Sequence, residues 1–376
     1  MSQNIDTLVI GGGIIGLLTA RELALAGQSV VILERNTRAG LESSWAGGGI
    51  LSPLYPWRYP DPVTELSVIG HREYPRLAAD LNESTGIDPE YVRSGHLILD
   101  VDEYDQAKAW AKRYQNKFSL DRKTKFLSLI RRSEMEKIEF ELSESFANAM
   151  WMPTIGQIRN PRLVKSLLKD LEQRGVKIIT EAAVEKINTE NGKVVGLVTS
   201  KGRCSAANYL VAAGAWTASL LEETGLSLEI QPVRGQMILF KIHPGRLRRI
   251  ILNNGKYLIP RKDGHILAGS TLEYVGFDKE ITDAAYQELW RAACNIAPFL
   301  ESMPVVKHWS GLRPGSSNSV PVIGTHPEFG NLVICSGHFR NGVIIGLASA
   351  RIAASLLCYQ LPRHALIEKE NPYAVC

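Results

Sequence analysis

The sequence lacks the patterns that mark metal-binding, disulfide-rich and secreted proteins. Its five cysteines are scattered over 376 residues, with no Cys-x-x-Cys pair and no cysteine–histidine spacing suited to a metal. This argues against zinc and iron–sulfur sites. An odd number of scattered thiols is typical of a reduced cytoplasmic protein, and the N-terminal residues show no basic region or cleavage site of a secretory leader. We therefore expect a cytoplasmic location and no bound metal.

The chain also has little excess charge and no uninterrupted membrane-length apolar run. Its 43 basic and 39 acidic residues leave a formal net charge of +4, which is too small to indicate a nucleic-acid partner. The segment 336–357 is long enough for a membrane helix, but Arg340, Asn341 and Arg351 interrupt it and favour a buried core helix. We expect neither nucleic acid nor a membrane span. Arg340, near the start of that helix, needs an anionic or polar partner.

The first 34 residues have the pattern that opens a doubly wound α/β fold. The apolar run IDTLVI at 5–10 precedes a glycine-rich turn, a helix-periodic segment from Leu17 to Ala26, and a second apolar run, SVVILE, at 29–34. A strand, a glycine turn, a helix and a second strand within about thirty residues predict a nucleotide-binding βαβ unit.

The same style of sequence returns in the middle and near the end of the chain. GVKIIT at 175–180 and NLVICSG at 331–337 have the pattern of buried strands, whereas 225–305 alternates in the manner of antiparallel strands. The fold class predicted is α/β, with a discontinuous Rossmann-like domain and a second, α+β domain containing an antiparallel sheet. We assign residues 1–86, 151–220 and 306–376 to the first domain, and 87–150 and 221–305 to the second.

The motif GGGIIG supplies Gly11, Gly13 and Gly16 at the G-x-G-x-x-G spacing. The first glycine allows a tight turn, the second allows close approach of a pyrophosphate, and the third lets the helix pack closely on the strand. Glu34 ends the next strand, where its carboxylate can accept hydrogen bonds from both ribose hydroxyls. These residues predict a dinucleotide site, and at this point either a flavin or a nicotinamide dinucleotide satisfies them.

A second glycine-rich loop, SSWAGGGIL, lies at 43–51, just beyond Glu34. Its glycines permit close backbone approach, and the hydroxyls of Ser43 and Ser44 can bond a phosphate or a ring edge. A flexible surface loop has a similar composition. A bound flavin has to be held along its length, and this loop suits that requirement.

The motifs, taken together, resemble a known family. VIGGGIIG, LER, SSWAGGGIL, VAAGAW, YLIPRKDGHILAGST, HWSGLRPG, VPVIG and GHFRNG occur in the order and spacing of the FAD-dependent amine and amino-acid oxidases of the D-amino-acid oxidase type. Within that family the chain is similar to the glycine oxidases of thiamine biosynthesis. The resemblance runs from Asp6 to about Leu357. GLRPG and GHFRNG together are specific to the group, whereas GGGIIG alone is not.

The resemblance implies that FAD is the cofactor and lies between the two domains. It implies contacts to FAD along both glycine-rich loops, through the backbone of one residue on the adenine side, and around the flavin ring by the run 338–344. The implied cofactor residues, beyond Gly11, Gly13, Gly16 and Glu34, are Ile14, Ile15, Arg35, Ser43, Ser44, Gly48, Gly49, Ile50, Val184, His338, Phe339, Arg340, Asn341, Gly342, Val343 and Ile344. The related sarcosine oxidases tether flavin through a cysteine near GLRPG. Gly311 stands near that position here, so we expect non-covalent FAD.

For the substrate, the resemblance implies Tyr257, Arg313 and Arg340. The planar fork of an arginine matches a carboxylate, so we expect Arg313 to clamp the substrate and Arg340 to be a second cation beside it. Tyr257 would donate to the same carboxylate rather than take a proton. Because hydride transfer to flavin N5 requires only a neutral amine, we assign no catalytic general base.

The activity expected from this resemblance is the oxidation of glycine, sarcosine, D-alanine and related small amines. Dioxygen would be the acceptor, and the products would be an imine, then an oxo acid and ammonia, with hydrogen peroxide. The resemblance also implies a homo-oligomer, often a tetramer, and a role in thiazole formation. Three alternatives stay open: a D-amino-acid dehydrogenase that reduces a quinone, a non-catalytic FAD-stabilised subunit of a larger complex, and a dehydrogenase using free NAD.

Overall fold

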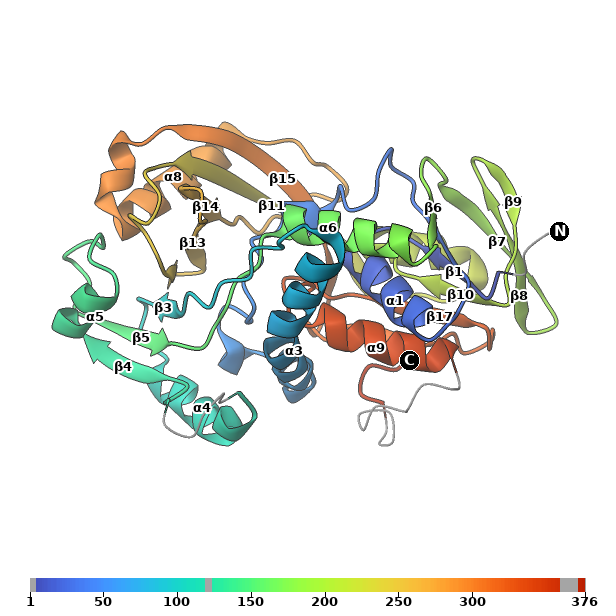
Figure 1. Cartoon of the computed structure of the whole chain (residues 1–376), viewed down its shortest axis with the longest axis horizontal. Helices are drawn as coiled ribbons and strands as arrows, with labels where there is room; N and C mark the ends of the chain where they lie inside the picture. The colour runs from blue at the N-terminus through green and yellow to red at the C-terminus, as the bar shows by residue number, and fades with distance from the viewer. Residues whose placement is uncertain (1–4, 119–123, 359–370, 376) are drawn as a thin grey trace.

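The computed structural model describes residues 5–118, 124–358 and 371–375. The molecule is elongated, with one sheet near each end and helices α3 (Asp61–Thr85) and α6 (Asn160–Gln173) between them (Figure 1). The described strands form a six-stranded sheet, an eight-stranded sheet and a small three-stranded sheet. This arrangement agrees with the α/β class and the antiparallel second domain predicted from the sequence.

The six-stranded sheet is parallel except at one edge. Its strands run in the order β16-β17-β10-β1-β2-β6, and β16 is antiparallel to β17. The order reverses at β1, which pairs with β2 on one side and with β10 on the other. In such sheets, ligands bind at the carboxyl ends of the strands where the order reverses. The bounds are β1 (Thr7–Ile10), β2 (Val30–Leu33), β6 (Lys177–Ile179), β10 (Asn208–Val211), β16 (Val322–Thr325) and β17 (Leu332–Ser336).

Both faces of this sheet are covered, which explains why its strands are apolar throughout. Val9 and Ile32 face a core formed with α1 (Ile14–Leu25), α3, α6 and α9 (Gly346–Leu357). Leu8 and Val31 face the opposite core, against the small sheet. A parallel strand buried on both faces reads as a continuous hydrophobic run rather than an alternation. The small sheet is β7 (Val184–Glu190), β8 (Lys193–Thr199) and β9 (Gly202–Cys204).

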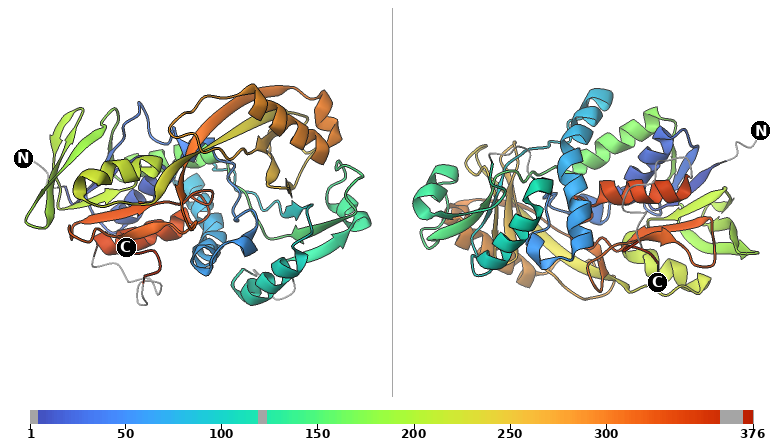
Figure 2. Two further views of the ribbon diagram at one scale, coloured as in Figure 1. Left: turned by 180° about the vertical axis from the view of Figure 1, so that it is seen from behind. Right: turned by 90° about the horizontal axis from the view of Figure 1, so that it is seen from below.

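The eight-stranded sheet is mostly antiparallel and runs in the order β15-β11-β14-β13-β12-β3-β5-β4. Cores on its two faces involve α4 (Tyr104–Phe118) on one side and α8 (Asp283–Ile296) on the other. Its longest strands, β11 and β15, extend toward the six-stranded sheet (Figure 2). The bounds are β3 (His96–Ile98), β4 (Ser128–Arg131), β5 (Asn148–Met152), β11 (Ile230–Lys241), β12 (Ile250–Asn253), β13 (Lys256–Pro260), β14 (His265–Gly269) and β15 (Val305–Ser316).

The remaining elements are short. They are the helices α2 (Ser43–Ala46), α5 (Arg132–Ile138) and α7 (Thr217–Leu221), and the 3-10 turns η1 (Pro56–Arg58), η2 (Gly214–Trp216), η3 (Glu222–Thr224) and η4 (Pro298–Ser302). None of the helices in the described ranges is both long and apolar enough to cross a membrane.

Two local expectations differ from the structure. The helix predicted over 336–357 begins only at Gly346. Gly337 (φ 77°) and Phe339 (φ 46°) have left-handed backbone, which excludes a helix before residue 340, and turns follow up to residue 345. The region 225–305, which the sequence pattern predicted as antiparallel strands, also contains the helix α8 (Asp283–Ile296). Arg313 lies within β15.

The domain boundaries remain a prediction. The pairing of β15 with β11 places residues 305–316 in the eight-stranded sheet, which favours a boundary after Ser316 rather than at 306. The four described cysteines (Cys204, Cys294, Cys335 and Cys358) are free thiols, and Cys376 lies outside the described residues.

Candidate active site between the two sheets

A cavity of about 490 Å³ lies between the six-stranded and the eight-stranded sheet. Loops that follow β1, β2, β10 and β17 form one wall, and residues of β11, β13 and β15 form the other. Most of the residues predicted to bind FAD line it, namely Gly11, Gly13, Ile14, Ile15, Glu34, Arg35, Ser43, Ser44, Gly48, Gly49, Ile50, Val184, His338, Phe339, Arg340, Asn341, Gly342 and Val343. The predicted substrate residues Tyr257, Arg313 and Arg340 line the same cavity.

Two predicted residues, Gly16 and Ile344, are absent from the lining and pack in the core instead. A Cβ on Gly16 would lie 2.0 Å from the carbonyl oxygen of Gly11, so this glycine lets α1 approach the preceding turn. Ile344 is 1% exposed within the helical core. Gly11 has φ 110°, and a Cβ there would lie 2.5 Å from the oxygen of Ala212. The turn after β1 therefore requires glycine for both conformation and space.

Ordered polar contacts hold the turn between β1 and α1. The buried carboxylate of Glu34 accepts a hydrogen bond from the Gly12 N–H at 2.9 Å and another from the Asn36 N–H at 2.8 Å. The Ile14 N–H donates to Ser44 Oγ at 2.8 Å, which links the first glycine-rich loop to the second. The N-terminus of α1, which attracts anions, thus opens onto the cavity.

The loop after α2 presents backbone donors to the cavity. Among the described residues, the N–H groups of Gly48, Gly49 and Ile50 have no acceptor, and all three residues line the cavity. A Cβ on Gly48 would lie 2.6 Å from Ile259 Cδ1, and one on Gly49 would lie 2.0 Å from the Ile158 oxygen. These glycines let the backbone fit between the two domains, and their N–H groups are donors available to a ligand in the cavity.

Arg35, after β2, and Trp216, after β10, both line the cavity and contact each other. The Arg35 guanidinium carbon lies 3.4 Å from the Trp216 ring centroid, and its Nη2 donates to Glu42 Oε1 at 2.9 Å. The ring of Phe277, from the second domain, stacks on Trp216 with centroids 5.3 Å apart. Val184, at the start of β7, also lines the cavity. An aromatic and guanidinium wall of this kind suits a flat base.

The segment between β17 and α9 forms another part of the wall. The N–H groups of Arg340, Gly342 and Val343 have no acceptor within the described parts of the chain. Burial lowers the pKa of His338 to about 3, so its imidazole is neutral near pH 7 and supplies no charge. Backbone donors next to the start of α9 therefore provide the electropositive surface here.

Arg313, on β15, and Arg340, in the segment after β17, bring two cations close together in the cavity. Arg313 Nη2 donates to Ser270 Oγ at 2.8 Å, and Nη1 donates to the Thr271 carbonyl oxygen at 3.2 Å. Within the described ranges neither arginine forms an ion pair with a carboxylate. Burial lowers the pKa of Arg313, the neighbouring Tyr257 opposes that shift, and the nearby Arg340 lowers the pKa further.

Sequence reasoning missed several residues of this cavity: Asn160, Trp216, Gly235, Ser270 and Arg261, the last lying just behind the loop at Gly48. Gly235 could have been found, because a glycine inside a strand indicates close approach of another group. A Cβ on Gly235 would lie 2.0 Å from Arg313 Nη2. Asn160 gives no such signal. Both polar atoms of its side chain are buried without a partner in the described part of the chain, next to Gly47 and Gly49.

These features together fit an elongated anionic dinucleotide. Unpartnered N–H donors lie along two walls, glycines leave room for close approach, and a buried carboxylate ends β2. No group of three or more metal-ligating side chains occurs among the described residues. Comparison with family sequences matches residues 6–356 to the FAD dependent oxidoreductase family. The chain belongs to this family.

Individual members of this FAD-dependent oxidoreductase family are similar along the whole chain. A glycine oxidase of Pseudomonas aeruginosa is 43% identical over 375 residues, covering 100% of this chain and 99% of that protein. The bifunctional protein ThiO/ThiG of Trichormus variabilis is 29% identical over 359 residues, covering 94% of this chain and 53% of that protein. The crystal structure of glycine oxidase from Geobacillus kaustophilus superposes with a TM-score of 0.90 at 27% identity, covering 99% of this chain and 98% of that one.

These matches confirm the predicted fold, the cofactor and the class of activity. The protein is an FAD-dependent amino-acid oxidase that acts on a small molecule. The alternative of a dehydrogenase using free NAD is thereby wrong. The individual residues that contact FAD and substrate remain predictions, and so does the tetramer.

Proposed function

We propose that this FAD-dependent oxidase acts on glycine and other small amino acids or amines, such as sarcosine and D-alanine, with dioxygen as the electron acceptor. The observation that carries the proposal is the pair of guanidinium groups of Arg313 and Arg340, which line one cavity and have no carboxylate partner in the described part of the chain. Two such cations beside a cofactor cavity favour an anionic substrate, and the carboxylate of a small amino acid meets that need.

The surrounding contacts prepare Arg313 for this role. Ser270 and Thr271 hold its guanidinium, and Gly235 leaves the space in which it lies. Tyr257 lies next to Arg313, where its phenol can donate to the same carboxylate, while the nearby Arg340 adds positive charge. With its carboxylate held by Arg313, a substrate would have its α-carbon and amine in the same cavity that the loops at Gly48 and Gly342 line. Position and orientation are the main contributions of the protein to the reaction.

FAD, when bound, supplies the acceptor for the hydride that leaves the substrate α-carbon. The chain contributes two further effects. Arg313 and Arg340 lower the pKa of a substrate ammonium near them, which makes the neutral amine available without a dedicated base. The N–H groups of Arg340, Gly342 and Val343 offer donors to negative charge that develops on the cofactor. We assign no residue as general base.

The overall reaction proposed for glycine consumes one dioxygen and one water. It forms glyoxylate, ammonia and hydrogen peroxide, which balances all atoms. The intermediate imine is also the form in which two carbons and a nitrogen could enter thiazole synthesis. A role in thiamine biosynthesis is part of the proposal, and the similarity of this chain to about half of a bifunctional ThiO/ThiG protein supports it.

An anaerobic flavin-reduction screen tests the function directly. We expect glycine, sarcosine or D-alanine to bleach the flavin absorption near 450 nm, and air to restore it with about one hydrogen peroxide per substrate oxidised. Failure of all three amines to reduce the flavin would contradict the proposal. Reduction of a quinone or dye without oxygen uptake would instead support the dehydrogenase alternative. Turnover by a single purified chain would exclude a non-catalytic subunit.

A further inference from the structure

Arg261 connects the second domain to the cofactor loop of the first domain. It follows β13, in the turn that leads to β14, and only 8% of its surface is exposed. Its guanidinium donates to the Gly48 carbonyl oxygen at 2.7 Å, to Gln157 Oε1 at 2.7 Å and to the Ile158 carbonyl oxygen at 3.2 Å. All three acceptors lie outside the eight-stranded sheet, so this one side chain joins the domains at the edge of the cavity.

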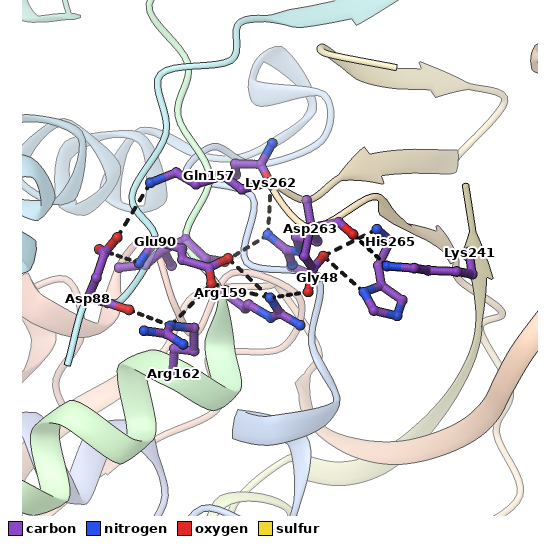
Figure 3. A network of polar contacts seen from close by, with 12 residues as sticks. Gly48, Asp88, Glu90, Gln157, Arg159, Arg162, Lys241, Lys262, Asp263 and His265 are labelled. Carbon is purple, nitrogen blue, oxygen red and sulfur yellow. Dashed lines mark hydrogen bonds and ion pairs between the residues drawn. The ribbon is translucent and has the colours of Figure 1, made fainter. Parts of the chain in front are cut away.

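A network of ion pairs surrounds Arg261, and Arg261 does not take part in it. Arg159 forms ion pairs with Glu90 and Asp263, and His265 Nδ1 lies 2.9 Å from Asp263 Oδ1 (Figure 3). Arg261 itself forms no ion pair among the described residues, and neutral oxygens accept all three of its guanidinium hydrogen bonds there. The carboxylates of Glu90 and Asp263 offset the cost of burying the positive charge of Arg261. The Arg261 guanidinium can therefore remain charged while it donates to the Gly48 carbonyl.

The position of the acceptor explains what the contact does. The Gly48 carbonyl and the Gly49 N–H belong to one peptide group, and their directions are fixed relative to each other because that group is planar. The carbonyl is bonded to Arg261, and the N–H lines the cavity without an acceptor in the described part of the chain. A charged donor on the carbonyl also strengthens the N–H as a donor.

We propose that Arg261 is a positioning residue for the cofactor, which acts through Gly48 to aim the Gly48–Gly49 peptide at FAD and to lock the two domains around it. Arginine suits this role because its planar fork serves Gly48 and Gln157 at once. Lysine would bring the charge as a single point and lose one of the two bonds. The turn that carries Arg261 is therefore part of the cofactor site although it does not line the cavity.

The test measures FAD binding in the absence of substrate, so it does not depend on which amine is oxidised. Release of FAD from the diluted holoenzyme is followed by the recovery of flavin fluorescence, in wild type, Arg261→Met and Arg261→Lys. The matched control is Lys262→Met, because Lys262 is the next residue, is exposed, and forms a surface ion pair with Asp88. The visible absorption bands of bound flavin and the thermal unfolding midpoint are recorded for each variant.

We expect the FAD dissociation constant to rise about tenfold to a hundredfold in Arg261→Met, as for the loss of a charge-assisted hydrogen bond. The rise in Arg261→Lys should be smaller, the flavin bands of both variants should shift, and Lys262→Met should match wild type. A merely structural role would lower the unfolding midpoint with the dissociation constant and bands unchanged, and that result would overturn the proposal. If Arg261→Met does not fold, the FAD dissociation constant and the flavin absorption bands of Arg261→Lys test the proposal in the same way.

Discussion

Arg313 lies over the backbone of Gly235, and this single contact links a strand glycine to substrate recognition. Any Cβ at position 235 meets the guanidinium at 2.0–2.3 Å. We expect Gly235→Ala to displace Arg313 and to raise the apparent KM for glycine about tenfold or more, with FAD content unchanged. Gly330→Ala is the control, because nothing lies within 4 Å of a Cβ there and its φ is ordinary. A normal KM in Gly235→Ala would show that the guanidinium does not hold substrate.

Removing the Arg313 guanidinium itself is a second test of whether this residue binds the substrate carboxylate. Arg313→Ala deletes two charge-assisted donors, and we expect kcat/KM for glycine to fall about a hundredfold or more while FAD stays bound. Arg313→Lys should recover part of this loss, because it restores charge without the planar fork. The measurement is steady-state peroxide release, together with the flavin content of each purified variant. An unchanged kcat/KM in Arg313→Ala would refute the carboxylate clamp.

At the scale of the element, the position of the loop between α2 and Leu51 depends on the left-handed backbone of Gly49. Gly49 has φ 71°, and a Cβ there would lie 2.0 Å from the Ile158 oxygen. We expect Gly49→Ala to push the loop out of place and to leave the purified protein largely without flavin, which the ratio of absorbance at 450 and 280 nm reports. Gly27→Ala carries a similar backbone strain (φ 82°) but meets nothing within 4 Å, so it separates steric clash from strain. Full flavin content in Gly49→Ala would contradict the role given to this loop.

The elements also show how far the sequence could predict the site. The sequence could predict the βαβ unit, the two glycine-rich loops and the presence of Arg313 and Arg340 in one site, because each depends on local spacing or on a family motif. The start of α9 was not predicted, since no pattern in the sequence marks the left-handed backbone at Gly337 and Phe339 or the turns that follow it up to residue 345. Arg261 and Asn160 were also missed. Their roles arise from contacts across more than a hundred residues, as between Arg261 and Gly48, which no local pattern encodes.

At the scale of the whole molecule, buried histidines make stability depend on pH. Burial lowers the pKa of His96 to about 3, well below the value near 6.5 that histidine has in an unfolded chain. The unfolded state therefore binds more protons between these values. The stabilising contribution is complete above pH 6.5 and is lost as pH falls toward 3, at up to about 1.4 kcal/mol per pH unit for one such group.

We therefore expect the free energy of unfolding to decrease steadily as the pH is lowered from 6.5, as measured by urea denaturation at a series of pH values. His96→Gln cannot titrate and should show a shallower dependence over the same interval. His243→Gln is the control, since His243 is exposed. An identical slope in wild type and His96→Gln would show that this imidazole does not control the acid response.

The order of strands in the six-stranded sheet has a consequence for how the cofactor is acquired during protein synthesis. The first strand made, β1, lies beside β10, and β10 lies beside β17, which is completed only at Ser336. The wall at 338–343 is translated later still. A nascent chain shorter than this has the first glycine-rich loop but no closed cavity, because pairing between distant segments must come first. Loading of FAD is thus a late event, and the cell has to keep nearly the entire polypeptide soluble before its flavin can stabilise it.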